Sequence, residues 1–125
     1  MMDTQTSEPQ LYDVWLMWVE YPDHPGVGKP RPVVITSIDG NGMMSGTVVK
    51  VTGNMEWDGA GDVPLLDWRS EGLAKPSLAR CSQRFYFDRQ ELLKRFGRLS
   101  VRDAQQVNEG IEATPDIAPY QRFRE

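Results

Sequence analysis

The stretch GVGKPRPVVITS, residues 26–37, decides the fold class of this 125-residue chain. Glycines, prolines and two cations precede a run of β-branched residues, so the pattern predicts a basic loop followed by a strand over 31–38. Pro32 has no N–H group and therefore belongs at the start of that strand or at a sheet edge. The stretch lacks the spacing of a nucleotide-binding phosphate loop, and it leads into a strand where such a loop must open a helix. An ordinary solvated loop is the competing interpretation.

The neighbouring segments predict more strands. YDVWLMWVEY, residues 12–21, is apolar on both alternating faces, which predicts a strand covered on each side, one side by a second subunit. DGNG at 39–42 is typical of a hairpin turn, and MSGTVVKVT at 44–52 predicts the next strand. The segment 53–76 is rich in glycine and aspartate, which predicts a long loop with a brief strand at VPLL.

The alternation in SLARCSQRFYF, residues 77–87, predicts another strand. One face would be apolar, with Ala79, Cys81, Phe85 and Phe87. The other face would form a basic ridge, with Arg80, Ser82 and Arg84.

Two short helices are predicted to close the domain. DRQELLKRFG, residues 88–97, starts with Asp88 as N-cap and Glu91 at the capping-box position, and VRDAQQVNEGI, residues 101–111, follows Ser100 in the same way. The fold class is therefore mainly β with short appended α-helices. We expect a disordered N-terminal tail at 1–10, one domain at 11–112 and a loosely attached C-terminal tail at 113–125.

Composition limits the function classes. The net charge of −4 argues against a globally basic nucleic-acid binder. Cations in the middle of the chain still leave room for a local positive face: Lys29, Arg31, Lys50, Lys75, Arg80 and Arg84. Cys81 is the only cysteine and His24 the only histidine, which excludes an internal disulfide, a Cys/His zinc site and a pair of catalytic histidines.

No cofactor or metal is expected from the acidic residues. They lack a repeated ligand spacing, which favours a solvated acidic loop: Glu56, Asp58, Asp62, Asp67 and Glu71. The chain also shows neither a signal peptide nor a membrane span, which predicts a cytoplasmic protein with no membrane partner.

The order of these segments resembles the PemK/MazF family of toxin endoribonucleases over about residues 12–111. The most specific pieces are RPVV at 31–34, KVT at 50–52, GLAKPSLARC at 72–81 and GRLS at 97–100. The resemblance implies a small SH3-like β-barrel of the PemK/MazF/CcdB type, usually a homodimer. It also implies the toxin of a type II toxin–antitoxin system, which cleaves single-stranded RNA at short motifs without a metal and is neutralised by a cognate antitoxin.

The resemblance also assigns site residues. Arg31 stands at the arginine that opens the family's RPV strand and Thr52 at the threonine that ends the next strand, the catalytic pair in part of the family. Arg80 stands at another functional arginine, and Asp13 at the acidic position before the first tryptophan. Three positions depart from the family pattern: Tyr12 replaces a glycine, Gly53 a serine and Ser82 an aspartate.

Metal-free cleavage uses the RNA 2′-hydroxyl as nucleophile and leaves a 2′,3′-cyclic phosphate. Arg31 and Arg80 would stabilise the developing negative charge, and Thr52 would donate a hydrogen bond. His24 is the one side chain with an ordinary pKa near neutrality, so it is the predicted general base. The expected RNA-binding residues are Lys29, Lys50, Lys75, Ser77, Ser82 and Arg84.

Two other functions remain open. Because Gly53 and Ser82 depart from the family pattern, the chain could be a catalytically degenerate barrel that binds RNA or protein. A toxin of related fold that poisons DNA gyrase would act by protein contact alone.

Overall fold

A computed structural model describes residues 8–20, 24, 26–39 and 44–120. In these ranges six antiparallel strands form one sheet in the order β4-β5-β3-β2-β1-β6. The strands are β1 (Asp13–Glu20), β2 (Gly28–Asp39), β3 (Ser45–Thr52), β4 (Asp62–Pro64), β5 (Leu78–Asp88) and β6 (Leu92–Arg98). The same residues contain one α-helix, α1 (Val101–Glu112). The mainly β prediction is confirmed.

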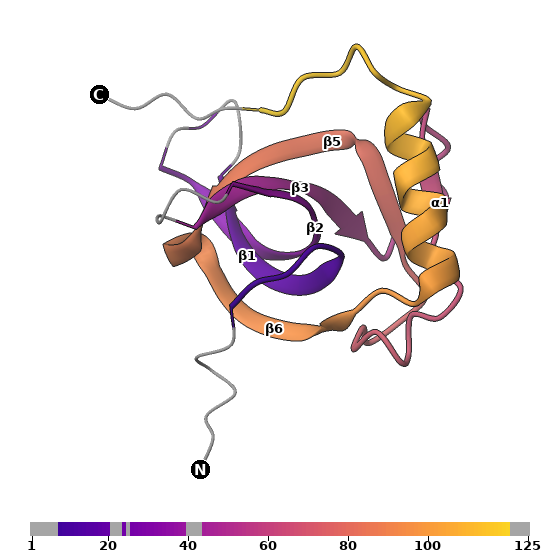
Figure 1. Cartoon of the computed structure of the whole chain (residues 1–125), viewed down its shortest axis with the longest axis horizontal. Helices are drawn as coiled ribbons and strands as arrows, with labels where there is room; N and C mark the ends of the chain where they lie inside the picture. The colour runs from indigo at the N-terminus through magenta and orange to yellow at the C-terminus, as the bar shows by residue number, and fades with distance from the viewer. Residues whose placement is uncertain (1–7, 21–23, 25, 40–43, 121–125) are drawn as a thin grey trace.

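The sheet curls strongly but does not close, since β4 and β6 are its two edges. Figure 1 shows the curl end-on, with β5 and β6 on opposite sides of the ring. The concave face packs on itself: Phe85 of β5, Leu92 of β6 and Trp15 of β1 share one buried cluster, although three strands separate β5 from β6 in the sheet. This concave core is built almost entirely of strand residues.

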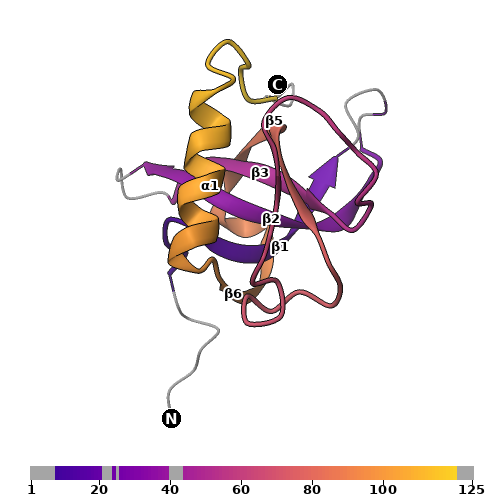
Figure 2. The same ribbon diagram turned by 90° about the vertical axis from the view of Figure 1, so that its right-hand side faces the viewer.

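A second core lies between the opposite face of the sheet and α1. Val107 of the helix is fully buried there with Val14 and Val49 of the sheet. Figure 2 shows α1 crossing in front of the strands. Val14 and Trp15 of β1 therefore face different cores, which confirms a strand covered on both sides. The cover comes from the chain itself, so the predicted second subunit is not needed to explain it.

The prolines of β2 determine where this strand loses a neighbour. β2 starts at Gly28, earlier than predicted, and pairs with β1 from there onward. Pairing with β3 begins only at Val33, which lies opposite Lys50. Pro30 and Pro32 therefore occupy the part of β2 that has a single neighbour, as expected for residues without an N–H group. Val33–Lys50 is thus the last pair at this end, and the residues that follow Lys50 on β3 have no partner on β2.

The helix predicted over 88–97 is wrong. Its capping signal is real, because the Asp88 N–H donates to Glu91 Oε1 at 2.9 Å, but only a single 3₁₀ turn (Arg89–Glu91) follows. Leu92 then enters the concave core and the chain pairs with β1 as β6. Burial and strand pairing outweigh a local helix signal here. The second helix is confirmed, with Ser100 Oγ accepting from the Asp103 N–H at 3.2 Å.

A bulge in β5 overturns the predicted basic ridge. The register with β3 jumps from Val49–Arg84 to Lys50–Arg80, so residues 81–83 have no counterpart on β3. Extra residues in one strand break the alternation of faces. The supposed single apolar face is divided between the cores, with Ala79 and Cys81 on the helix side and Phe85 and Phe87 on the concave side.

Several expectations fall partly outside the described residues. These are 1–7 of the N-terminal tail, 22, 23 and 25 of the basic loop, 40–42 of the DGNG turn and 121–125 of the C-terminal tail. The described part of the last segment returns to β5, where the Tyr120 ring meets Phe85 edge-on with centroids 6.0 Å apart. Within the described ranges, no helix has the length and apolar character that a bilayer crossing requires.

Candidate functional site

Three cations from neighbouring strands meet at one end of the concave face. Lys50 of β3 lies opposite Val33 of β2 on one side and Arg80 of β5 on the other. Residues directly opposite each other project from the same face, and Arg31, two positions before Val33, shares that face. We call Arg31, Lys50 and Arg80 the cationic cluster.

Lys50 is half-buried between the positive charges of Arg31 and Arg80. Burial lowers the pKa of Lys50, and the charges of Arg31 and Arg80 lower it further. Like charges held together in a half-buried place favour the approach of an anion or the loss of a proton. The arrangement therefore suits a phosphate group.

Thr52 and Lys75 complete the same surface. Thr52 lies two residues beyond Lys50 on β3, and its Oγ1 accepts a hydrogen bond from the Asn54 N–H at 3.1 Å. Lys75 reaches the adjacent position, because a Cβ added to Gly53 would lie 2.9 Å from Lys75 Nζ. The lysine side chain thus occupies the space beside Thr52 that the family serine at position 53 would need.

Arg80 is held more firmly than Arg31. Its Nε lies 3.3 Å from Asp62 Oδ1 across the β4–β5 pair, and its guanidinium stacks on the Trp57 ring at 4.4 Å from the centroid. Only 13% of the Arg80 side chain is exposed. Asp62 and Trp57 were not expected from the sequence to contact an arginine, because they come from a loop and a brief strand whose pairing partner no local pattern reveals.

The other predicted site residues lie in different surroundings. His24 is exposed in the β1–β2 connection, where its carbonyl accepts from the Val27 N–H at 2.9 Å, and no described contact links it to the cationic cluster. Lys29 is exposed on β2, two residues before Arg31. Ser77 is buried and donates to the Lys75 carbonyl at 2.8 Å, and Ser82 lies in the β5 bulge.

Arg84 serves the end of α1. Its guanidinium donates to four carbonyl oxygens at 2.7–3.0 Å, those of Cys81, Ile111, Thr114 and Ile117. Ile111 lies in the last turn of the helix, and Thr114 and Ile117 follow it. The Ile111 and Thr114 carbonyls also accept from the Thr114 and Ile117 N–H groups, so the arginine adds charged donors to a turn that already has backbone hydrogen bonds. The arginine therefore ties β5, α1 and the following segment together.

Asp13 is a structural anchor. It is fully buried, accepts hydrogen bonds from the Trp15 indole at 3.2 Å and the Gln10 N–H at 2.9 Å, and pairs with Arg95 and Arg98 at 3.3 Å each. The preceding residue, Tyr12, has a φ of 69°. Glycine adopts that conformation most easily, which explains a glycine at this position in the family pattern.

The predicted solvated acidic loop is wrong in part. Asp62 pairs with Arg80, and Glu71 is fully buried near Asp67 and Asp103, the three carboxylates lying within 4.8 Å of one another. Among the described residues, these three carboxylates form the group whose spacing could suit a metal ion. Burial, followed by a hydrogen bond to Asp103, raises the pKa of Glu71 to about 7. The Ser100 N–H donates to Glu71 Oε2 at 2.8 Å, so the group lies at the start of α1, away from the cationic cluster.

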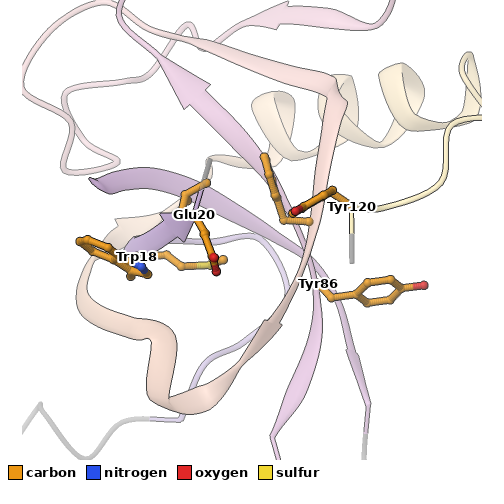
Figure 3. A pocket seen from close by; sticks show the side chains of 7 residues that line it. Trp18, Glu20, Tyr86 and Tyr120 are labelled. Atoms are coloured by element: carbon orange, nitrogen blue, oxygen red, sulfur yellow. The ribbon is translucent and has the colours of Figure 1, made fainter. Parts of the chain in front are cut away.

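A small cavity lies elsewhere, between β1 and β5. Figure 3 shows Trp18 and Glu20 on one side of it and Tyr86 and Tyr120 on the other. Its volume is about 10 Å³, space for one water molecule. It contains none of the predicted site residues and is too small for a nucleotide.

Comparisons with known proteins agree with the family resemblance. A family model described as "PemK-like, MazF-like toxin of type II toxin-antitoxin system" matches residues 10–114. A solved Mycobacterium tuberculosis toxin, MazF-mt6, is similar with a TM-score of 0.64 and 22% identity, covering 85% of this chain and 98% of that one. An endoribonuclease in complex with its cognate antitoxin, from a Mycobacterial species, gives 0.62 and 15%, covering 90% and 100%. At these identities the solved structures support the fold alone. A search of curated proteins gives no match.

Proposed function

Because the chain belongs to the PemK-like, MazF-like toxins of type II toxin–antitoxin systems, we propose that it is an endoribonuclease that cuts single-stranded mRNA at short sequence motifs without a metal ion. Cutting transcripts would stop translation and growth, and a cognate antitoxin would neutralise the protein. One of the similar proteins is described as an endoribonuclease in complex with its cognate antitoxin. With these substrates and partners, we expect it to act in the cytoplasm.

The observation that carries the proposal is the cationic cluster beside Thr52. A phosphodiester has one negative charge, and the five-coordinate state formed during attack has about two. Fixed cations bind the second state more strongly than the first, which lowers the activation barrier. Arg31 and Thr52 lie on one face, on β2 and β3 respectively, each two residues past the last pair of these strands, which supports their joint use on one phosphate.

The proposed reaction requires no external nucleophile. The 2′-oxygen forms a bond to the adjacent phosphorus while the bond to the 5′-oxygen breaks, giving a 2′,3′-cyclic phosphate and a 5′-hydroxyl. Arg31, whose planar guanidinium matches two phosphate oxygens, stabilises the growing charge. Thr52 donates a hydrogen bond to the same phosphate, and Lys29 and Lys75 hold neighbouring phosphates. Arg84 and Ser77 have no part in this scheme, because their donors are engaged inside the protein.

A proton must also leave the 2′-hydroxyl. His24, the general base expected from the sequence, is exposed without a described contact to the cluster. Lys50 lies at the centre of the cluster, and its lowered pKa gives it a larger neutral fraction than an ordinary lysine. We therefore assign the proton transfer to Lys50, since lysines with lowered pKa values act as general bases.

We also propose that the protein forms a homodimer, as the family resemblance implies. The curled sheet would then be an SH3-like barrel of the family type. Trp18 is 39% exposed on β1 and offers apolar surface for a partner. Sedimentation at micromolar concentration should give twice the 14.2 kDa chain mass. A species of 14.2 kDa alone would contradict the dimer.

The test of the activity is incubation with a long single-stranded RNA in the presence of EDTA. The wild type should cut at defined sites, and Arg31→Ala should lose about 100- to 1,000-fold in rate, the usual effect of removing one charge-stabilising donor. Arg102→Ala, which removes an exposed arginine of α1, is the matched control and should cut normally.

Cutting that is equal in the wild type and Arg31→Ala would reject the assigned site. RNA that is bound but never cut would favour the degenerate barrel, for which Gly53 and Ser82 are the reason. A protein that neither binds nor cuts RNA but inhibits DNA gyrase would favour the gyrase-directed toxin.

A further inference from the structure

Trp57 is a large aromatic side chain held in the open beside the cationic cluster. It lies on the loop between β3 and β4, and the Arg80 guanidinium covers one face of its ring at 4.4 Å from the centroid. Half of the residue, 50%, is nevertheless exposed. Much of the residue is therefore accessible to a ligand.

The loop around Trp57 is fixed by its own hydrogen bonds. The Asn54 N–H donates to Thr52 Oγ1 at 3.1 Å and the Glu56 N–H to Asn54 Oδ1 at 3.0 Å. At the other end the Gly59 N–H donates to Asp62 Oδ2 at 2.8 Å, while the second oxygen of Asp62 holds Arg80. A ligand that uses the ring thus finds it already in place, which reduces the entropic cost of binding.

Charge decides which part of a nucleic acid suits this ring. Glu56 and Asp58 flank Trp57 in the sequence and are exposed, so they repel phosphate. The cationic cluster, reached through Arg80, attracts phosphate instead. A neutral, flat group is therefore favoured at Trp57 when an anionic group occupies the cluster.

We propose that Trp57 is the stacking platform of a nucleobase subsite, on which one base of a single-stranded RNA lies while the neighbouring phosphate contacts the cationic cluster. Every base has a π-face, and stacking on an aromatic side chain is a common mode of single-strand recognition. This inference rests on the proposed function, because it assigns a second contact to the same substrate.

Binding of a 2′-O-methyl RNA strand of mixed sequence, which lacks the free nucleophile, tests the subsite. Trp57→Ala should weaken binding roughly 5- to 150-fold, the usual value of stacking one base. Trp57→Phe should retain most of the affinity. Tyr86→Ala, which removes an aromatic of similar exposure (47%) on β5, is the matched control and should bind like the wild type.

Two further readouts separate stacking from mere support of Arg80. The dependence of affinity on salt should stay unchanged in Trp57→Ala, because stacking neutralises no phosphate; a slope reduced by about 0.7 would mean that a phosphate contact was lost and would overturn the proposal. The second readout uses a series of strands in which a different single nucleotide is abasic. At one position, loss of the base should weaken binding to the wild type but not to Trp57→Ala.

Equal binding by the wild type and Trp57→Ala would also overturn the subsite. If the wild type meanwhile cuts unmodified RNA, the proposed function survives and only the subsite fails. If the wild type neither binds nor cuts RNA, both fail together.

Discussion

Lys50 lies between Arg31 and Arg80, and these neighbours set its chemistry. An exposed lysine stays protonated at neutral pH and serves only as a positive charge. Half-burial and two nearby guanidinium groups lower the pKa of Lys50, which supports the proton-transfer role that we propose for it. The sequence predicted Lys50 as a phosphate ligand, but the proposed proton-transfer role depends on two strand pairings that no local pattern contains.

The rate of RNA cleavage should therefore rise with pH until Lys50 is deprotonated, at a pKa below the usual 10.5. Lys50→Arg keeps the positive charge but cannot accept a proton, so it should bind RNA normally and lose about 10²- to 10⁴-fold in single-turnover rate. The pH–rate profile is the measurement. A normal rate and profile in Lys50→Arg, with their loss in His24→Gln, would give the role to His24.

Glu71 shows the same principle for a carboxyl group. Its pKa of about 7 in the folded chain exceeds the ordinary 4.5, so the folded state holds a proton that the unfolded state releases. The unfolding free energy should thus fall as pH rises from 4.5 through 7, by about 3 kcal/mol in total. Glu71→Gln stays neutral and should lack this loss.

Urea unfolding at about pH 5 and about pH 8.5 measures the effect. Asp67 does not interfere, because the hydrogen bond from Arg102 lowers its pKa to about 2, below the range tested. The same pH dependence in the wild type and Glu71→Gln would show that Glu71 does not hold the proton.

At the scale of elements, the features that the sequence did not predict lie mainly in β5 and in the segment that follows it. The strands β1, β2 and β3 and the helix α1 follow from apolar alternation and capping residues, because those signals are local. Residues 81–83 form a bulge whose only signal is the register against β3, and the helix predicted over 88–97 gives way to β6 because Leu92 is needed in the concave core. Tertiary burial decides both cases.

Arg84, just past that bulge, joins β5 to the end of α1. Arg84→Ala would remove four hydrogen bonds from a charged donor to backbone carbonyls and should lower the unfolding free energy by about 3 kcal/mol. The same change at Arg102, an exposed ion pair of α1, should cost less than about 1 kcal/mol. Urea unfolding of both variants checks the contrast, and equal small losses would show that Arg84 does not cap the helix.

At the scale of the whole molecule, an acidic chain brings three of its cations together at one place. The net charge is −4, yet Arg31, Lys50 and Arg80 converge through the order of three strands. The sequence and the family resemblance together identified these residues and Thr52. They did not predict Asp62 and Trp57 as partners of Arg80, because the contact depends on how the β3–β4 loop folds back over β5.

The central claim is that this surface cuts RNA through the RNA's own 2′-hydroxyl. Once a cut site is mapped, the most direct measurement compares the parent strand with one that carries a single 2′-deoxy nucleotide immediately 5′ of the cut. The account predicts that the substituted strand binds normally and stays intact, while the parent gives 2′,3′-cyclic phosphate and 5′-hydroxyl ends. Cutting of the substituted strand at the same site would contradict it.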